Sequence, residues 1–287
     1  MHVPVMVAEC LEYLAVRPDG IYLDATAGLG GHTAAIAKRL RSGLVIANDR
    51  DAESLEMAKR NTIEWADRIG YHHGSFSELG SALRAFGVER VDGLMADLGV
   101  SRYQLTEPER GFSLMAEGPL DMRIDRSQGR TAGELVNFTS EKELADLIYQ
   151  LGEERRSRKI SRAIVRARPI HTTAHLARVI EQAAPRTSKL HPATQTFMAL
   201  RMAVNDEQGE LDRLLEIAPD LVKSGGRMVI LTFMSLEDRK VKQSLQALAR
   251  AGRAITLTKH VIRPAQEETR DNPPSRSAKL RAVEMRQ

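Results

Sequence analysis

The sequence is poor in the residues that build several common kinds of site. Its single cysteine, Cys10, excludes a disulfide within the chain and a cysteine metal cluster. No apolar run approaches the roughly 18 residues that a membrane-spanning helix needs. The N-terminal stretch carries Glu9 and Glu12 and lacks the basic region of a signal peptide. We therefore expect a cytoplasmic protein with neither a disulfide partner nor a membrane partner.

Aromatic residues make up only 4% of the chain. Such a small supply argues against a broad sheet on which nucleic-acid bases stack. A base would have to be handled in one pocket or on a single-stranded segment. The histidines show no metal-ligand pattern, because His171 and His175 lack the glutamate of a zinc-protease helix, and we expect no metal site. The net charge of +4 is compatible with a polyanionic partner but does not identify one.

Apolar segments alternate with helical patterns over the first hundred residues. Such alternation is typical of βαβ units with a parallel sheet covered by helices on both faces. The expected strands cover residues 20–26, 43–49, 68–74 and 90–99, with helices over 33–40, 51–62 and 77–87. After residue 206 the pattern returns, with helices over 206–222 and 235–252, strands over 225–233, 254–264 and 278–286, and a polar loop over 265–277. A final strand pair fits the seven-stranded Rossmann-like α/β sheet of S-adenosylmethionine-dependent methyltransferases, whose last strand is antiparallel.

Residues 107–206 interrupt this alternation. Their first part has little periodicity, and from Thr131 onwards the pattern is helical, with Ser140 and Glu143 spaced as a capping box. We therefore predict one discontinuous domain, residues 1–106 and 207–287, with an all-helical inserted domain of residues 107–206.

A glycine-rich turn, "DATAGLGGHT", joins the first strand to the first helix and contains Gly28, Gly30 and Gly31. Glycines there allow a tight turn and close approach of a ligand, and the following helix N-terminus attracts negative charge. The fingerprint for NAD needs a third glycine where this chain has Thr33, and no lysine follows as in an ATP-binding loop. The turn therefore favours S-adenosylmethionine, with a ligand-free turn as the alternative.

Three further side chains follow the strands that end at the same edge of the sheet. Asp49 stands where an acid binds ribose hydroxyls, although it is equally suited to cap a helix, with Asp51 as the other candidate for that cap. Phe76 follows the third strand, near an expected adenine, and has a core aromatic as its alternative. Asp97 ends the fourth strand. Core packing does not account for an acidic residue at this position, and the alternative to a functional role is a turn or cap residue.

One helix of the insertion concentrates positive charge. Helical spacing places its cations on one face and Ile160 and Ile164 on the other. Arginine forms bidentate contacts with phosphate, so this face is a candidate RNA-binding surface, or else a solvated helix face. The candidate RNA-binding residues are Arg155, Arg158, Lys159, Arg162 and Arg166.

The chain resembles the bacterial 16S ribosomal RNA cytosine-N4 methyltransferases of the MraW/RsmH type. Matching blocks, "NPPSRSAKLR" among them, span nearly its whole length, and the specific ones are "ERGFS" with "GPLDMR", and "SLEDR". The resemblance implies methyl transfer from S-adenosylmethionine to the exocyclic N4 of a cytidine in the decoding region of 16S rRNA, within the small ribosomal subunit. It places cofactor contacts at Gly30, Gly31, His32, Asp49, Phe76, Asp97 and Gln104.

Asp97 is the candidate catalytic residue, either as acceptor for the target amine or as partner of the cofactor's amino group. The "NPPS" at 272–275 imitates the catalytic tetrapeptide of amino-methylating enzymes, but it lies in the last loop and we interpret it as a turn with a possible substrate contact. The chain departs from the resembled family at Arg102, Tyr103, Asp206 and Met234. These departures leave a non-catalytic ribosome-assembly factor as an alternative, and an NAD-dependent oxidoreductase is disfavoured by Thr33 and the terminal strand pair.

Overall fold

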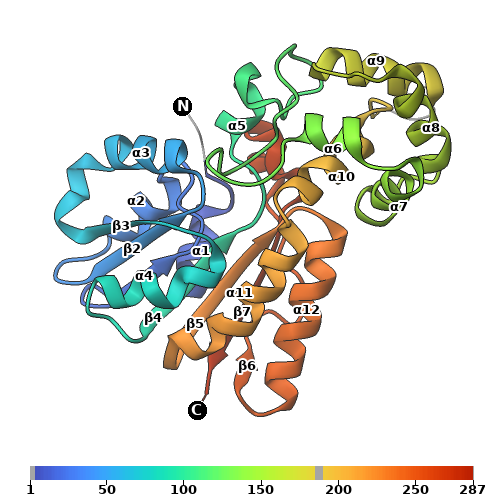
Figure 1. Ribbon diagram of the computed structural model, residues 1–287. Coiled ribbons are helices and arrows are strands. Elements are labelled where there is room, and N and C mark those ends of the chain that lie inside the picture. The colour runs from blue at the N-terminus through green and yellow to red at the C-terminus, as the bar shows by residue number, and fades with distance from the viewer. Residues whose placement is uncertain (1–3, 185–189, 287) are drawn as a thin grey trace. The chain divides into compact units, whose positions relative to one another are not determined.

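The computed structural model describes residues 4–184 and 190–286, and the chain divides into two compact units (Figure 1). The sheet unit consists of Met1–Gly99 and Gln208–Gln287, and the helical unit is Val100–Glu207. The helical unit thus starts at Val100 where the sequence analysis places the boundary at 107, and it ends at Glu207 rather than at 206.

The sheet unit contains a seven-stranded mixed sheet of order β3-β2-β1-β4-β5-β7-β6. Its strands are β1 (Ile21–Asp24), β2 (Leu44–Asp49), β3 (Ile69–His73), β4 (Val91–Asp97), β5 (Val222–Thr232), β6 (Ala254–Thr256) and β7 (Lys279–Met285). The first five strands pair in parallel, whereas β7 is antiparallel to both β5 and β6. The predicted Rossmann-like methyltransferase sheet, with its antiparallel last strand, is confirmed.

Helices cover both faces of this sheet. They are α1 (Val7–Leu14), α2 (Gly31–Ala37), α3 (Ala52–Asn61), α4 (Leu79–Ala85), α11 (Glu207–Leu221), α12 (Ser235–Arg250) and α13 (Gln266–Asp271), with short 3-10 turns η1 (Ile63–Arg68), η2 (Phe76–Glu78) and η4 (Pro273–Ser277). Along β4, Leu94 packs into the core under α4, α11 and α12, and Met95 packs into the core under α1 and α2. Successive strand residues point to opposite faces, so the near-continuous apolar strands follow from burial on both sides.

Two expectations for the C-terminal segment are wrong. The strand expected over 254–264 ends at Thr256, because the Thr258 hydroxyl accepts the Ala282 N–H and takes the place of a backbone carbonyl in the ladder. The expected loop over 265–277 contains helix α13 and turn η4. Glu267 and Glu268 lie in the first turn of α13, where negative charge favours a helix N-terminus.

The helical unit consists of α5 (Arg102–Thr106), turn η3 (Pro108–Arg110), α6 (Ala132–Phe138), α7 (Glu141–Gly152), α8 (Ser157–Ala167), α9 (Thr173–Ala183) and α10 (Thr194–Val204) around its own apolar core. The predicted capping box is confirmed: the Glu143 carboxylate accepts the Ser140 N–H, and the Ser140 hydroxyl accepts the Glu143 N–H.

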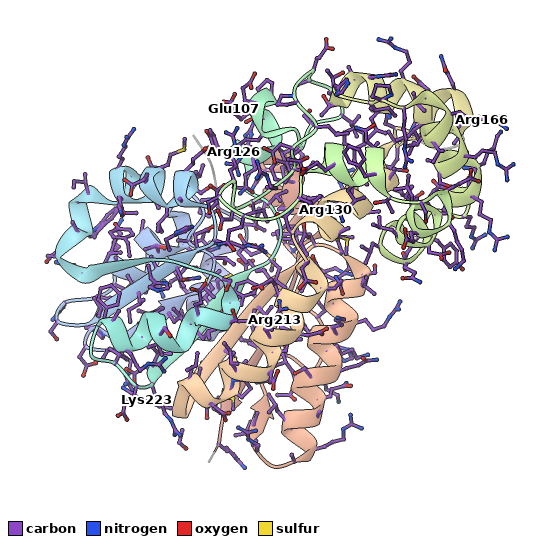
Figure 2. The ribbon with its side chains drawn as sticks, viewed as in Figure 1. Glu107, Arg126, Arg130, Arg166, Arg213 and Lys223 are labelled. Atoms are coloured by element: carbon purple, nitrogen blue, oxygen red, sulfur yellow. The ribbon has the colours of Figure 1, made fainter. Side chains whose placement is uncertain are left out.

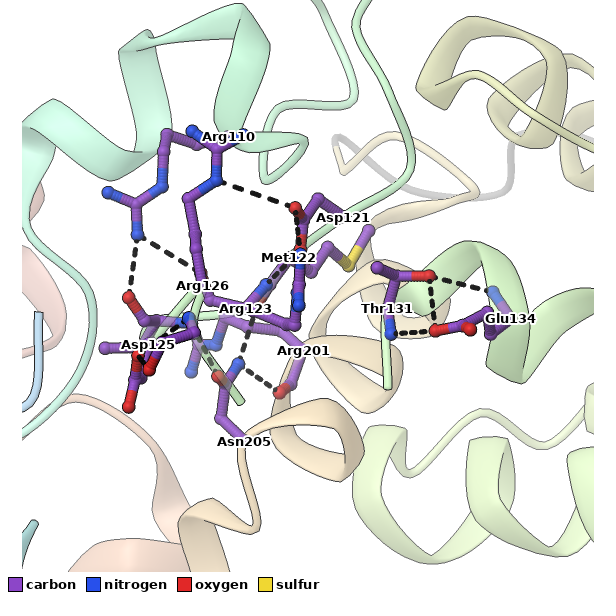
Figure 3. A network of polar contacts seen from close by, with 12 residues as sticks. Arg110, Asp121, Met122, Arg123, Asp125, Arg126, Thr131, Glu134, Arg201 and Asn205 are labelled. Atoms are coloured by element: carbon purple, nitrogen blue, oxygen red, sulfur yellow. Dashed lines mark hydrogen bonds and ion pairs between the residues drawn. The ribbon is translucent and has the colours of Figure 1, made fainter. Parts of the chain in front are cut away.

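The aperiodic segment between η3 and α6 is held by polar contacts rather than by regular structure (Figure 3). Asn205, which is 2% exposed, donates to the Met122 carbonyl and accepts the Ile124 N–H, both at 2.7 Å. Arg110 is 1% exposed and donates to the carbonyls of Arg123 and Ile124. Buried side chains therefore satisfy backbone groups that lack partners in helix or sheet.

Two kinds of feature are missing from residues 4–184 and 190–286. No helix there is both long and apolar enough to cross a membrane. The same residues include no group of three or more His, Cys, Asp or Glu side chains arranged to hold a metal ion.

Candidate functional site

Three carboxylates lie at the carboxyl ends of neighbouring parallel strands in the sheet unit. Asp24 ends β1, Asp49 ends β2 and Asp97 ends β4. The strand register pairs Asp24 with Ala47 on one side and with Met95 on the other. Ligands of open α/β sheets bind at this edge, so the strand ends place these residues around one candidate site.

The turn after β1 is anchored at both ends by Asp24. One of its oxygens accepts the Thr26 N–H at 3.2 Å, and the other accepts the Thr33 hydroxyl at 2.6 Å. Asp24 is fully buried, and burial raises the pKa of its carboxyl. It ties the end of β1 to the first turn of α2, a structural role that the sequence analysis missed although the acid is visible in "LDAT".

The three glycines of this turn differ in what surrounds them. Gly28 (φ +52°) and Gly30 (φ +88°) have left-handed backbones that favour glycine. A Cβ on Gly30 would lie 2.8 Å from the Thr62 side chain, and one on Gly31 would lie 2.8 Å from Pro4. A Cβ on Gly28 would meet nothing closer than 4.0 Å. Packing therefore explains the glycines at 30 and 31, and Gly28 is the one that leaves open space.

Asp49 faces Gly28. Its carboxylate accepts the Gly28 N–H at 2.6 Å through one oxygen and the Asp51 N–H at 2.8 Å through the other. Asp51, not Asp49, caps α3, because it accepts the N–H groups of Glu53 and Ser54. The helix-cap alternative for Asp49 is therefore wrong, and its carboxylate remains beside the glycine turn.

Asn48, one residue before Asp49, joins two loops of the site. Its buried side-chain amide donates to the carbonyls of Ala25, at 3.3 Å, and Gly74, at 3.0 Å. Phe76 follows Gly74, and its N–H donates to the Glu210 carboxylate at 3.0 Å. The Phe76 ring is partly buried against the core, so its predicted role beside an adenine and the core alternative are compatible.

Asp97 has one carboxylate oxygen without a partner. Its Oδ1 is buried and makes no hydrogen bond to any described residue. Its Oδ2 lies 3.7 Å from Nδ1 of His32, and its backbone N–H donates to the Thr26 hydroxyl at 2.6 Å. A buried acceptor without a donor is costly, and such groups are concentrated at functional sites. His32 itself is 5% exposed, and its Nε2 lies 2.9 Å from the Val5 carbonyl oxygen.

Burial changes the protonation of two of these acids. It raises the pKa of Asp49 to about 6, although the N–H groups of Asp51 and Gly28 act against the change. It also raises the pKa of Asp97 to about 6, where His32 lowers the value and the nearby carboxylates of Asp24 and Glu237 raise it. Perturbed acids at one edge of a sheet are typical of a binding or catalytic site.

Gln104 belongs to the helical unit, whereas the other predicted cofactor residues belong to the sheet unit. It is 4% exposed in α5, and its side-chain oxygen accepts the Ser101 N–H at 2.8 Å while Ser101 accepts the Gln104 N–H. This capping box gives Gln104 a structural role, and a cofactor contact at this position remains a prediction.

The predicted cationic face is present on the helical unit. Ile160 and Ile164 are fully buried and α8 begins at Ser157, so Arg155 precedes the helix rather than belonging to it. Figure 2 shows Arg166 pointing outward from α8. Of the five predicted cations, Arg162 alone forms an ion pair with a described residue, Glu141, at 3.4 Å. The exposed cations are Arg155, Arg158, Lys159, Arg162 and Arg166.

The "NPPS" segment forms η4 together with the residues that follow it. The predicted turn is thus confirmed, and Ser275 is fully buried within it. The departure at Met234 lies at the N-terminus of α12, where its N–H donates to the Glu237 carboxylate at 3.1 Å. Asp206 adopts a left-handed φ of +47°, a conformation that Asp tolerates better than most residues.

The family profile and the sequence relatives agree on one family. A family profile described as "MraW methylase family" matches residues 1–286. A protein of Solibacter usitatus named "Ribosomal RNA small subunit methyltransferase H" is 66% identical over the whole of both chains. A protein of the same name from Acidobacterium capsulatum is 49% identical and covers 99% of this chain and 98% of its own. A solved rRNA methylase from Streptococcus thermophilus is 12% identical, with a TM-score of 0.47 over 98% of this chain and 94% of that one.

Proposed function

Because this chain belongs to the MraW methylase family, we propose that it transfers a methyl group from S-adenosylmethionine to the exocyclic N4 of a cytidine in 16S ribosomal RNA. In this proposal the cytidine lies in the decoding region, and the substrate is the small ribosomal subunit in the cytoplasm. The names of the relatives support ribosomal RNA of the small subunit as the substrate. The observation that carries the proposal is Asp97, whose buried Oδ1 lacks a hydrogen-bond donor at the end of β4.

The residues of the sheet unit fit S-adenosylmethionine. Open space at Gly28 admits a ligand beside the backbone of the turn, and the Asp49 carboxylate next to it retains lone pairs for two ribose hydroxyls. Phe76 offers an apolar surface for the adenine. Asp97, at the end of β4, borders this site and keeps its unpaired Oδ1 for the target amine. In this proposal Gly30, Gly31, His32 and Gln104 complete the cofactor site, as the family resemblance implies.

The chain's own contribution to the reaction is orientation and acceptance of a proton. The bound sulfonium supplies an already activated methyl group. Cytosine N4 is a weak nucleophile because its lone pair is delocalised into the ring, so its alignment dominates the barrier. Oδ1 of Asp97 accepts one N4–H and thereby orients the amine. Transfer to N4 would break the carbon–sulfur bond of the cofactor and release S-adenosylhomocysteine, and the carboxylate of Asp97 is placed to take the proton that leaves N4.

His32 supports this role of Asp97. The Val5 carbonyl oxygen can only accept, so the 2.9 Å contact requires a hydrogen on Nε2 of His32, while Nδ1 lies 3.7 Å from Oδ2 of Asp97. Against the effect of burial, His32 lowers the pKa of Asp97 and so favours the charged carboxylate that accepts the amine proton.

The cationic face of α8 is the proposed RNA-binding surface of the helical unit. Its exposed arginines stand one turn apart at positions 158, 162 and 166, a spacing suited to successive phosphates. A surface without base contacts supplies affinity, so sequence specificity has to come from elsewhere.

The first prediction tests the activity itself. Purified chain and labelled S-adenosylmethionine are expected to methylate small ribosomal subunits taken from cells that lack this protein, and nucleoside mass spectrometry should identify N4-methylcytidine in the decoding region. Subunits from cells that contain the protein are the control, because their site is already modified. Failure to label the first preparation, or label at another atom, would contradict the proposed function.

The second prediction concerns Asp49. Replacing it by Ala should weaken binding of S-adenosylmethionine roughly 10- to 100-fold, because hydrogen bonds from two ribose hydroxyls to a charged acceptor are lost. Isothermal titration calorimetry measures this change. Asp51→Asn is the matched control, since Asn also caps helices and we expect cofactor affinity to stay within about twofold.

A cofactor analogue without the ribose 2′-hydroxyl separates the ribose contact from damage to the turn. The unmodified protein should bind it more weakly than S-adenosylmethionine, whereas Asp49→Ala should bind the two with similar affinity. Full discrimination retained by the variant would show that Asp49 acts only on the Gly28 backbone.

A further inference from the structure

A hollow of about 590 Å³ opens on the helical unit, apart from the outward cations of α8. One wall is α6, from Thr131 to Phe138, and the other is the segment that follows α8, from Arg168 to His171. The segment Pro119–Asp121 completes its lining. The proposed methyl transfer uses none of these residues.

The two carboxylates of the hollow are already engaged, as Figure 3 shows. Glu134 accepts the N–H and the hydroxyl of Thr131, at 2.8 and 3.1 Å. Asp121 forms a bidentate pair with Arg123, at 2.7 and 3.1 Å. Because both carboxylates already have partners, neither offers a free charge to a ligand, and a neutral, planar group with polar edges needs none.

Phe138 supplies a flat apolar surface at the rim. It is the last residue of α6, and its side chain is 76% exposed. A single exposed aromatic is ordinary on a protein surface, but this one borders a hollow. Stacking of a base on such a ring contributes about 1 to 3 kcal/mol in single-stranded nucleic-acid binding.

Arg168 brings an uncompensated positive charge to the opposite wall. Its guanidinium donates to the carbonyls of Val136 and Thr139 at the end of α6, and no carboxylate of the described residues pairs with it. The exposed side chain of His171 lies at the same wall. The hollow thus combines an exposed ring on one side with hydrogen-bond donors on the other.

The wall that carries Arg168 belongs to a strongly cationic part of the chain. From Arg155 to Ile180 the sequence contains eight Lys or Arg residues and no Asp or Glu. The cations of α8 therefore continue along the chain directly into the wall of the hollow. A polyanion bound along α8 would be led to this hollow at Arg168.

We propose that the hollow between α6 and Arg168–His171 binds one unstacked nucleobase of a single-stranded RNA segment whose phosphates follow the cations of α8. The base stacks on Phe138, and Arg168 and His171 face its polar edge. This inference rests on the proposed function for the identity of the nucleic acid, and it adds a base contact that the phosphate surface of α8 lacks.

The third prediction tests this site with the full chain and a short single-stranded RNA of mixed sequence that contains 2-aminopurine. Phe138→Ala should raise the Kd between about 5- and 100-fold and remove the fluorescence change that stacking produces. Phe138→Tyr, which keeps the ring, should retain both. Because Phe138 is largely exposed, neither variant should unfold, and circular dichroism verifies this.

Tyr149→Ala on α7 is the matched control, since Tyr149 is 59% exposed and lies outside the hollow. Its Kd should stay within about twofold of that of the unmodified protein. An unchanged Kd for Phe138→Ala would overturn the proposal. The proposal would also be overturned if Phe138→Ala lost binding to assembled subunits but bound naked RNA normally, because that result would point to a protein partner. These titrations contain no S-adenosylmethionine, so they are independent of the methylation assay that tests the proposed function.

Discussion

Asp97→Asn is expected to lower kcat for methyl transfer on the order of 100- to 1000-fold while S-adenosylmethionine still binds. The amide nearly preserves the shape of the side chain but cannot take the proton that leaves N4, and removing one such group costs about this much in other enzymes. Separate measurements of kcat and of cofactor affinity decide the role of Asp97. A loss confined to cofactor affinity would mean that Asp97 holds the cofactor's amino group instead of the target amine.

The pH profile of the unmodified protein gives a second measurement of the same carboxylate. Because burial raises the pKa of Asp97 to about 6, the carboxyl is charged above this pH and protonated below it. Only the charged form accepts the amine proton, so kcat should fall as the pH drops below about 6 and level off above about 7. A kcat that is independent of pH between 5 and 8 would contradict the assignment.

Asp97→Asn should raise the stability of the protein while it lowers the activity. In the folded protein the pKa of Asp97 is above its usual value, so the charged form costs folding free energy at pH 8 and this cost disappears as the pH falls towards 4. Asp97→Asn should therefore raise the free energy of unfolding by roughly 1 to 3 kcal/mol at pH 8, and by less at pH 4. Chemical denaturation at the two pH values measures this difference.

Asp92, at the opposite end of β4, provides the matched control. Burial alone would raise its pKa, but hydrogen bonds from the Ile21 N–H and from Lys223 hold the pKa below its usual value. Asp92→Asn should leave kcat unchanged and lower stability at neutral pH. That contribution should begin to fall below about pH 4 and vanish once the pH is below the lowered pKa of the folded protein, where the carboxylate is protonated.

The sheet could be predicted from the sequence because its strands are buried on both faces. In β4 the run from Leu94 to Ala96 is wholly apolar and fully buried, and such runs separated by helical patterns leave few alternatives to a parallel sheet. The terminal strands were harder to predict. The end of β6 depends on one hydroxyl, that of Thr258, whose hydrogen bond to Ala282 is a tertiary contact across 24 residues. No local pattern encodes such a contact.

The candidate site shows a similar division. Asp49 and Asp97 could be placed from the sequence because each follows a recognisable strand and all parallel strands end at one edge. The roles of the glycines were more difficult to predict. Sequence pattern cannot distinguish Gly30 and Gly31, which pack against Thr62 and Pro4, from Gly28, which leaves space for a ligand. Asn48 was missed because it lies inside an apolar strand, and only the structure reveals the two loops that it joins.

The hollow beside Phe138 had no sequence signal. Its walls come from segments around residues 120, 134 and 170. Hydrogen bonds of Leu120 to His171 and Gly133, and of the Asn137 side chain to Ile170, bring them together over the core of the helical unit. The amphipathic pattern of α8, in contrast, predicted the burial of Ile160 and Ile164 and the exposure of its cations, although not the burial of Ser157 and Ser161. Periodicity is therefore informative about one helix, but a surface built from several segments requires their tertiary arrangement.

Reversal of three charges on α8 is expected to have the largest effect on RNA binding. The triple change of Arg158, Arg162 and Arg166 to Glu replaces three candidate phosphate contacts by repulsion, so the Kd for single-stranded RNA should rise at least about 100-fold at moderate salt. The plot of log K against log salt concentration should become less steep, and the magnitude of its slope should decrease by about 0.7 for each lost contact, or about 2 in total. Binding titrations at several salt concentrations measure both quantities.

The control carries the same change of charge on another exposed helix face, with Arg239, Lys242 and Arg250 of α12 replaced by Glu. If only the net charge of the chain mattered, the two triple variants would weaken binding equally and show the same salt slope. A loss restricted to the α8 variant instead requires phosphates to contact this helix. Equal losses would leave α8 as a solvated helix face and would remove the path that leads RNA from α8 to the hollow beside Phe138.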